Sequence, residues 1–323
     1  MGMRILLAGT HRCGSTWVAN VLGRSPDVLN VFEPDSPKTD ILGTVTTNRL
    51  GEYPALDPEQ RSFWYSMVWD LAFRGGWPWS RSPSARRMGR GLVRVPPAVR
   101  DYGVAALARG IATIRSRPAH VVIKSVNSAF TLEWIARRYQ PRIVILRRNP
   151  LNVVSSWLVL NIEGEPDLPA RRLVRERWLE PLGVPPRPAH SKVASTAWDV
   201  GVLMCALRAS AERHPDWMVV SHDELSASPE ELFPSLFNEL GLPWTDEARA
   251  YLRASDEPGF VVRGVSRPGR HPNEQTATDD GRSRRLQQSS QYKRRLSAEQ
   301  VAEATAVLAA MPLGSWGVPH TEP

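Results

Sequence analysis

The sequence is poor in the residues that would indicate a disulfide scaffold, a metal site or a membrane anchor. Its 323 residues include only two cysteines, Cys13 and Cys205, too few for a disulfide framework and not spaced as a zinc site. The seven histidines show no metal-ligand spacing either. No apolar stretch reaches eighteen residues, and the run after Met1 is too short for a secretory signal. We therefore expect a cytoplasmic protein without membrane insertion and without a bound metal.

Lysine is scarce as well, although the chain is strongly basic. Lys38, Lys124, Lys192 and Lys293 are the only lysines among 41 basic residues, and the formal net charge is +8. A balance of this kind favours an anionic partner such as nucleic acid, an acidic membrane surface or a multiply phosphorylated cofactor. The preference for arginine over lysine can also reflect a GC-rich genome. Composition alone leaves these alternatives open.

Short apolar runs alternate with helical patterns along much of the chain. Strands are predicted at about 4–9, 121–123, 142–146 and 217–221, and helices at about 15–24, 129–139, 151–160 and 192–213. Ser228 followed by Pro229 predicts another helix start, and Ser297 with Gln300 forms a capping-box pattern for a last helix ending near residue 310. This alternation predicts an α/β, P-loop-like three-layer fold with a central parallel sheet of about five strands.

Three stretches interrupt the alternation, at about 50–118, 161–191 and 259–295. The first contains Trp64, Trp69, Trp77 and Trp79, the second is rich in proline and arginine, and the third is basic with little apolar content. We interpret residues 1–323 as one domain with two variable insertions at the edge of the sheet and a basic segment before the last helix. The tryptophans either stack against a substrate or cover the sheet.

The loop after the first strand carries the clearest functional motif. Residues 9–17 read GTHRCGSTW, which contains the two glycines and the hydroxyl residue of a phosphate-binding loop. Such a loop, with the helix that follows it, presents backbone N–H groups to an oxyanion. An NTPase needs a lysine where this chain has Ser15, and the nearest cation is Arg12.

A second motif lies at residues 143–157, IVILRRNPLNVVSSW. Arg148 ends the strand and Ser156 lies on the second turn of the next helix, with Ser155 as the neighbouring alternative. A guanidinium and a hydroxyl placed in this way can converge on one phosphate. In an NTPase this strand can end in the aspartate that holds magnesium, whereas here it ends in two arginines.

Together the two motifs resemble the 5′-phosphosulfate loop and the 3′-phosphate signature of sulfotransferases that use 3′-phosphoadenosine 5′-phosphosulfate (PAPS). The style of the motifs is similar to carbohydrate-type and bacterial members, although Arg12 stands where that family usually has lysine. The resemblance implies PAPS as cosubstrate, its desulfated form PAP as product, and no metal. The cofactor-binding residues that it implies are Arg12, Cys13, Gly14, Ser15, Thr16, Trp17, Arg148 and Ser156, with Arg267 and Arg270 from a loosely matching late basic loop.

The catalytic group is less well defined by the resemblance. Val126 replaces the histidine that follows a Lys-Ser pair in the phenol and steroid branch of the family, so the base must come from elsewhere. Glu33, in a Phe-Glu-Pro sequence similar to that of carbohydrate sulfotransferases, is the favoured base, and His11 is its rival. Arg12 and Lys124 are expected to stabilise the charge that develops on the transferring and leaving groups.

The predicted reaction is in-line transfer of the sulfuryl group to a hydroxyl of a small-molecule or carbohydrate-like acceptor. The alternatives are a P-loop kinase or NTPase, a nucleic-acid-binding module, and a catalytically weak relative that binds PAP or PAPS. The sequence contains no recognised nucleic-acid-binding fold, so a nucleic-acid partner is not expected. Acceptor identity and oligomeric state are not encoded in these motifs.

Overall fold

One five-stranded sheet, parallel throughout, forms the centre of the described part of the molecule. The computed structural model describes residues 2–77, 95–116, 118–189, 191–257 and 290–318. The strands are β1 (Met3–Gly9), β2 (Val28–Phe32), β3 (His120–Ser125), β4 (Arg142–Arg147) and β5 (Met218–Ser221), in the order β2-β3-β1-β4-β5. Each neighbouring pair is parallel. The predicted α/β class with a five-stranded parallel sheet is confirmed.

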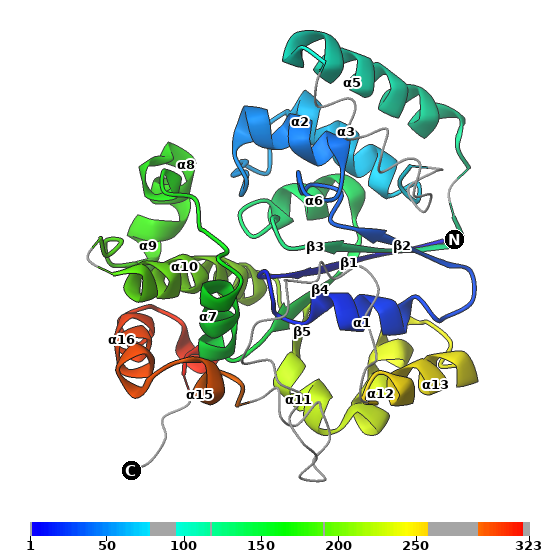
Figure 1. Cartoon of the computed structure of the whole chain (residues 1–323). Helices are drawn as coiled ribbons and strands as arrows, with labels where there is room; N and C mark the ends of the chain where they lie inside the picture. The colour runs from blue at the N-terminus through cyan, green and yellow to red at the C-terminus, as the bar shows by residue number, and fades with distance from the viewer. Residues whose placement is uncertain (1, 78–94, 117, 190, 258–289, 319–323) are drawn as a thin grey trace.

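Helices cover both faces of this sheet, which is why its strands read as nearly continuous apolar runs. Leu6 and Ala8 of β1 belong to one buried cluster, and Ile5 and Leu7 belong to the other. Helices α2, α3, α5 and α6 lie on one side, whereas α1, α12 and α13 lie on the other (Figure 1). Successive side chains of a strand point to opposite faces of the sheet, so the strands contribute to two apolar cores.

Among the described helices, α5 and α10 are the longest, with 18 and 22 residues. Their bounds are α1 Ser15–Leu22, α2 Ile41–Leu50, α3 Phe63–Ala72, α5 Pro97–Ile114, α6 Leu132–Tyr139, α7 Pro150–Val159, α8 Arg172–Val174, α9 Glu180–Leu182, α10 Lys192–Arg213, α11 His222–Ala227, α12 Pro229–Leu240, α13 Asp246–Ala254, α15 Tyr292–Arg295 and α16 Ala298–Ala309. None of the helices in these described segments has both the length and the apolar content needed to cross a membrane.

Local capping explains several of the helix starts. Asn149 accepts a hydrogen bond from the Leu151 amide at 2.9 Å, and Pro150 occupies the first turn of α7. The capping box of Ser297 and Gln300 is formed at the start of α16, as predicted. Helix α12 begins at Pro229 as predicted, but the Ser228 side chain makes no capping hydrogen bond.

Several elements were not predicted, among them β2, α2, α3, α5 and α13. Strand β2 was missed because it is a half-buried edge strand paired only with β3, and polar Asn30 interrupts its apolar run. The stretch 50–118 contains α3 and α5. In that stretch Trp69 and Trp77 are buried in the core cluster, so they stabilise the covering layer instead of facing a substrate, while Trp79 lies outside the described residues.

The strand order places the predicted motifs at one edge of the sheet. Strand β1 is central, between β3 and β4, and all three strands end at the same edge because they are parallel. The chain leaves β1 for α1 on one face and leaves β4 for α7, which packs with the core of the other face. Diverging connections of this kind create the crevice in which open α/β sheets bind ligands.

Candidate functional site

The loop after β1 has a strained, open backbone at the start of α1. Arg12 has φ of 71° and Gly14 has φ of 91°, both in the left-handed region. Gly14 occupies the cap position of α1 and offers no side-chain capping bond, so the first-turn amides at Ser15 and Thr16 have no cap. A non-glycine residue held at positive φ is a frequent feature of ligand-binding loops. The arrangement suits an oxyanion at the N-terminus of α1.

Gly14 is required for a second reason, because the ring of His222 packs directly against it. A Cβ at residue 14 would overlap the Cδ2 atom of His222. His222 is the first residue of α11, is 3% exposed, and lies 5.7 Å from the Trp17 ring in an edge-on arrangement. Sequence analysis missed His222. Its position directly after strand β5 was the sequence feature that could have identified it.

Arg12, Arg148 and Ser156 meet although they come from separate motifs. The Arg12 Nε atom donates to Ser156 Oγ at 2.9 Å, and Arg148 Nη1 donates to the Arg12 carbonyl at 3.0 Å. The Ser155 hydroxyl donates instead to the Asn152 carbonyl within α7, at 3.0 Å. Ser156 is therefore the serine that faces the loop, and Arg12 contacts both Ser156 and Arg148.

The surroundings of Arg148 keep it charged but poorly hydrated. Burial lowers the pKa of its guanidinium to about 10, nearby Arg12 and Arg295 act in the same direction, and Asp223 opposes them. Asp223 Oδ2 accepts the Asn149 amide at 2.7 Å, which anchors the turn between β4 and α7. A desolvated guanidinium that remains charged at neutral pH gains more from an added phosphate than an exposed one does.

Glu33 and Lys124 form an ion pair at the ends of adjacent strands. The Lys124 Nζ atom donates to Glu33 Oε1, and the Glu33 amide donates to the Lys124 carbonyl at 2.6 Å. Their side chains are 17% and 6% exposed. Burial by itself would raise the pKa of Glu33, but Lys124 outweighs it and the pKa is lowered. Glu33 also has φ of 45°, so its backbone is held in the left-handed region.

His11 faces the same space from the loop. Its Nε2 atom is 3.0 Å from Asn127 Oδ1, a pairing that places the hydrogen on Nε2 and leaves the Nδ1 lone pair available. Burial lowers the pKa of His11 to about 4, so the ring is neutral at pH 7. The Trp157 indole donates to the His11 carbonyl at 3.0 Å and fixes the loop to α7.

Asp35 is a titratable residue of this region that sequence analysis missed. It is 1% exposed, and its Oδ2 atom accepts from Ser125 Oγ at 2.7 Å. Burial raises the pKa of its carboxyl to about 7. Asn127 donates to the Asp35 carbonyl at 3.4 Å. Two successive hydrogen bonds through Asn127 therefore link Asp35 to His11. Its position two residues after Glu33 was the sequence feature that could have identified Asp35 as a site residue.

The remaining predicted residues divide into buried, partly exposed and undescribed ones. Cys13 is fully buried under Gly9, and Trp17 is 9% exposed with its indole donating to Ser255 Oγ at 3.0 Å. Val126, at the position of the missing histidine, is 1% exposed. Arg267 and Arg270 lie outside the described residues, as does most of the segment 259–295. The described residues hold no cluster of three or more His, Cys, Asp or Glu suited to a metal ion.

A cavity of about 390 Å³ is lined by residues of the second predicted insertion and of the start of α10. Polar groups line it, among them Glu163, Lys192 and Asp199. Asp199 accepts two hydrogen bonds of 2.8 Å from Arg187. The ring of Tyr53 is 6.2 Å from that of His11, and burial raises the pKa of Tyr53. The loop after β1 does not line this cavity.

Comparisons with known proteins find similar structures but no similar sequences. No family model matches the chain, and no curated protein matches it. A solved structure of a sulfotransferase domain from the curacin biosynthetic pathway has 11% identity and a TM-score of 0.40, with 77% of each chain covered. Sulfotransferase STF9 from Mycobacterium avium has 12% identity and a TM-score of 0.39, with 78% of this chain and 67% of that chain covered. Likeness at this level assigns no activity and no residue role to the chain.

Proposed function

We propose that the protein is a sulfotransferase that moves the sulfuryl group of PAPS to a hydroxyl of a small-molecule or carbohydrate-like acceptor. The observation that carries this proposal is the meeting of Arg12, Arg148 and Ser156, in which residues up to 144 positions apart converge beside the uncapped start of α1. Two anion-binding arrangements side by side suit a nucleotide with phosphate groups at both its 5′ and 3′ ends.

In this proposal the loop binds the 5′ end through the amides of Ser15 and Thr16. Arg148 and Ser156 bind the 3′-phosphate, and Arg12 contributes positive charge between the two ends. The Arg12–Ser156 hydrogen bond supports this arrangement because it holds both groups in place before the ligand arrives.

Glu33 accepts the proton of the acceptor hydroxyl in the proposed transfer. As that proton moves, the acceptor oxygen bonds to sulfur, the bond from sulfur to the bridging oxygen breaks, and its electron pair stays on the 5′-phosphate of PAP. Protonation of Glu33 removes the charge that holds Lys124, so the ammonium becomes available to the leaving oxygen. The acceptor is placed towards the 390 Å³ cavity, whose hydroxyl and carboxylate groups suit a hydroxylated ligand.

An assay of sulfuryl transfer from PAPS tests this proposal. Purified protein is incubated with PAPS and a panel of sugars, amino sugars and phenols, and both PAP release and sulfated product are measured by mass spectrometry. Acceptor-dependent PAP release supports the proposal. Phosphorylated products from magnesium-ATP, with no reaction from PAPS, would contradict it and favour a kinase.

A further inference from the structure

A basic groove is lined by residues in and around α3, by residues of α5 and by Arg138 of α6. Its volume is about 510 Å³, and four arginines line it: Arg61, Arg74, Arg109 and Arg138. Asp70 is the one carboxylate in the lining. The groove shares no residue with the loop after β1, with the turn after β4 or with the 390 Å³ cavity. It is therefore a candidate site of its own.

The four guanidiniums of the groove differ from most other described arginines in lacking an acidic partner. Arg137, next in sequence to Arg138, pairs with Glu59 at 2.7 Å, and Arg172 pairs with Glu176 at 3.0 Å. Within the described residues none of the four groove arginines forms such an ion pair. Four guanidiniums with only one carboxylate, Asp70, among them repel one another, and a bound anion would relieve that repulsion.

Two of these guanidiniums are oriented by neutral contacts that leave their charge uncompensated. Arg74 Nη1 donates to the Arg115 carbonyl at 3.2 Å. Arg138 Nη2 donates to the Gln60 carbonyl at 3.0 Å, and its guanidinium lies 4.6 Å from the centre of the Trp134 ring. These contacts already restrict the two side chains, so binding a ligand to them costs less conformational entropy.

The spacing along α3 indicates the size of the ligand. Arg61 precedes α3, and the bond from Arg138 to the Gln60 carbonyl places Arg138 at that same end. Arg74 follows the last residue of α3, so the two ends lie about 15 Å apart at the rise of an α-helix. A single inorganic anion reaches only one end, whereas a ligand carrying several anionic groups can contact both.

Apolar groups on the floor of the groove favour an organic ligand over a free ion. They comprise the side chains of Phe63, Met67, Ala108 and Ala112, and the Phe63 side chain is 50% exposed. We propose that this groove binds an organic polyanion bearing sulfate or phosphate esters, with its body on Phe63 and its anionic groups on the arginines. The binding is independent of the proposed transfer site.

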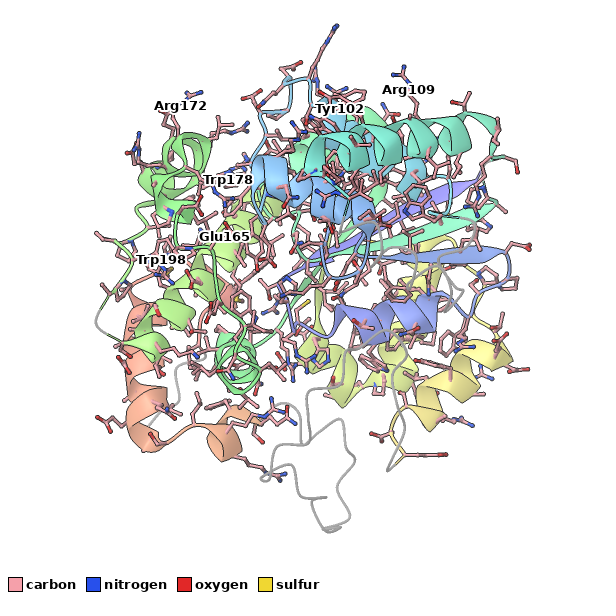
Figure 2. The ribbon with its side chains drawn as sticks, turned by 45° about the horizontal axis from the view of Figure 1, so that its top comes forward. Tyr102, Arg109, Glu165, Arg172, Trp178 and Trp198 are labelled. Carbon is pink, nitrogen blue, oxygen red and sulfur yellow. The ribbon has the colours of Figure 1, made fainter. Side chains whose placement is uncertain are left out.

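Calorimetric titration of the full-length protein with sucrose octasulfate, and separately with inositol hexakisphosphate, tests this proposal. The variant is the double substitution Arg61→Gln with Arg109→Gln. Arg172→Gln is the matched control, because Arg172 is 73% exposed, is paired with Glu176, and projects from α8 well away from Arg109 on α5 (Figure 2). We expect the double variant to weaken binding of at least one ligand by about tenfold or more, and the control to change it by less than about twofold.

Several results would overturn the proposal: no binding of either ligand, equal weakening by Arg172→Gln, or unchanged binding in the double variant. A further measurement separates the two sites. Binding that persists in the presence of saturating PAP, or in Arg148→Ala, supports the groove. Binding that either change abolishes assigns the polyanion to the loop after β1 and contradicts the inference.

Discussion

At the scale of single residues, the site contains two groups that are unprotonated at neutral pH and can accept a proton. The pKa of Glu33 is lowered because Lys124 outweighs its burial, and the pKa of His11 is lowered to about 4 by burial. They differ in what protonation releases. Protonating Glu33 frees the buried Lys124 ammonium, whereas protonating His11 adds a charge beside it. The first change supplies positive charge where a leaving phosphate needs it, which favours Glu33 as the base.

Glu33→Gln is expected to lower turnover with PAPS by about 100-fold or more, the range typical of losing a general base. The amide oxygen can still accept from Lys124, so PAP affinity should change little. The control is Glu59→Gln, an exposed carboxylate paired with Arg137. Near-normal turnover in Glu33→Gln, together with loss of turnover in His11→Asn, would transfer the role to His11.

The buried carboxyl of Asp35 makes a prediction about stability and pH. Its pKa is raised from 3.8 to about 7 by burial, so the folded state holds this proton more tightly than the unfolded chain does. The stabilisation is complete below the unfolded pKa and is lost as the pH rises through 7. Urea unfolding should show wild type losing up to about 4 kcal/mol relative to Asp35→Asn between pH 3 and pH 8. A difference that does not vary with pH would contradict the protonated state of Asp35.

At the scale of elements, α1 and α11 are in tight contact through Gly14 and His222. Gly14 begins α1 at positive φ, and His222 begins α11 against it. The contact brings the loop after β1 next to the end of β5. Gly103 in the middle of α5 is not constrained in this way, since a Cβ at that position meets nothing within 4 Å.

These two glycines provide a matched pair of alanine substitutions. Gly14→Ala should destabilise the protein by roughly 1–3 kcal/mol or more, because alanine resists positive φ and its Cβ would displace His222. Gly103→Ala should stabilise it by about 0.5–1 kcal/mol through helix propensity. Thermal and urea unfolding measure both changes. Equal effects of the two substitutions would show that the His222 contact does not constrain the loop.

Sequence patterns predict the elements best where apolar runs and capping residues coincide. The runs of β1, β3 and β4 are buried on both faces, and α10 occupies the predicted range 192–213. Edge strand β2 lacked that signal because only Val31 in it is buried. Helix α5 was missed for a similar reason: it contains Gly103 and Gly110, and its exposed face carries Tyr102 and Ile114, so its apolar period is weak.

At the scale of the whole molecule, the strand order creates the site. The sequence predicts that Arg12, Arg148 and Ser156 bind anions, but it cannot show that Arg12 bonds to Ser156, because that contact depends on β1 lying beside β4. Asn127, Asp223 and His222 escaped prediction because their roles come from tertiary contacts with His11, Asn149 and Gly14. The groove between α3 and α5 was equally hidden, since its arginines come from two helices, α5 and α6, and from the segments on either side of α3.

Calorimetric titration with PAP tests the central claim most directly, using wild type, Arg148→Ala, Ser156→Ala and Ser155→Ala. The claim predicts tight PAP binding by wild type, weakening of about 100-fold in Arg148→Ala and about tenfold in Ser156→Ala, and little change in Ser155→Ala, whose hydroxyl bonds within α7. Magnesium-ATP should bind weakly. Absence of PAP binding, or a preference for magnesium-ATP, would contradict the sulfotransferase proposal.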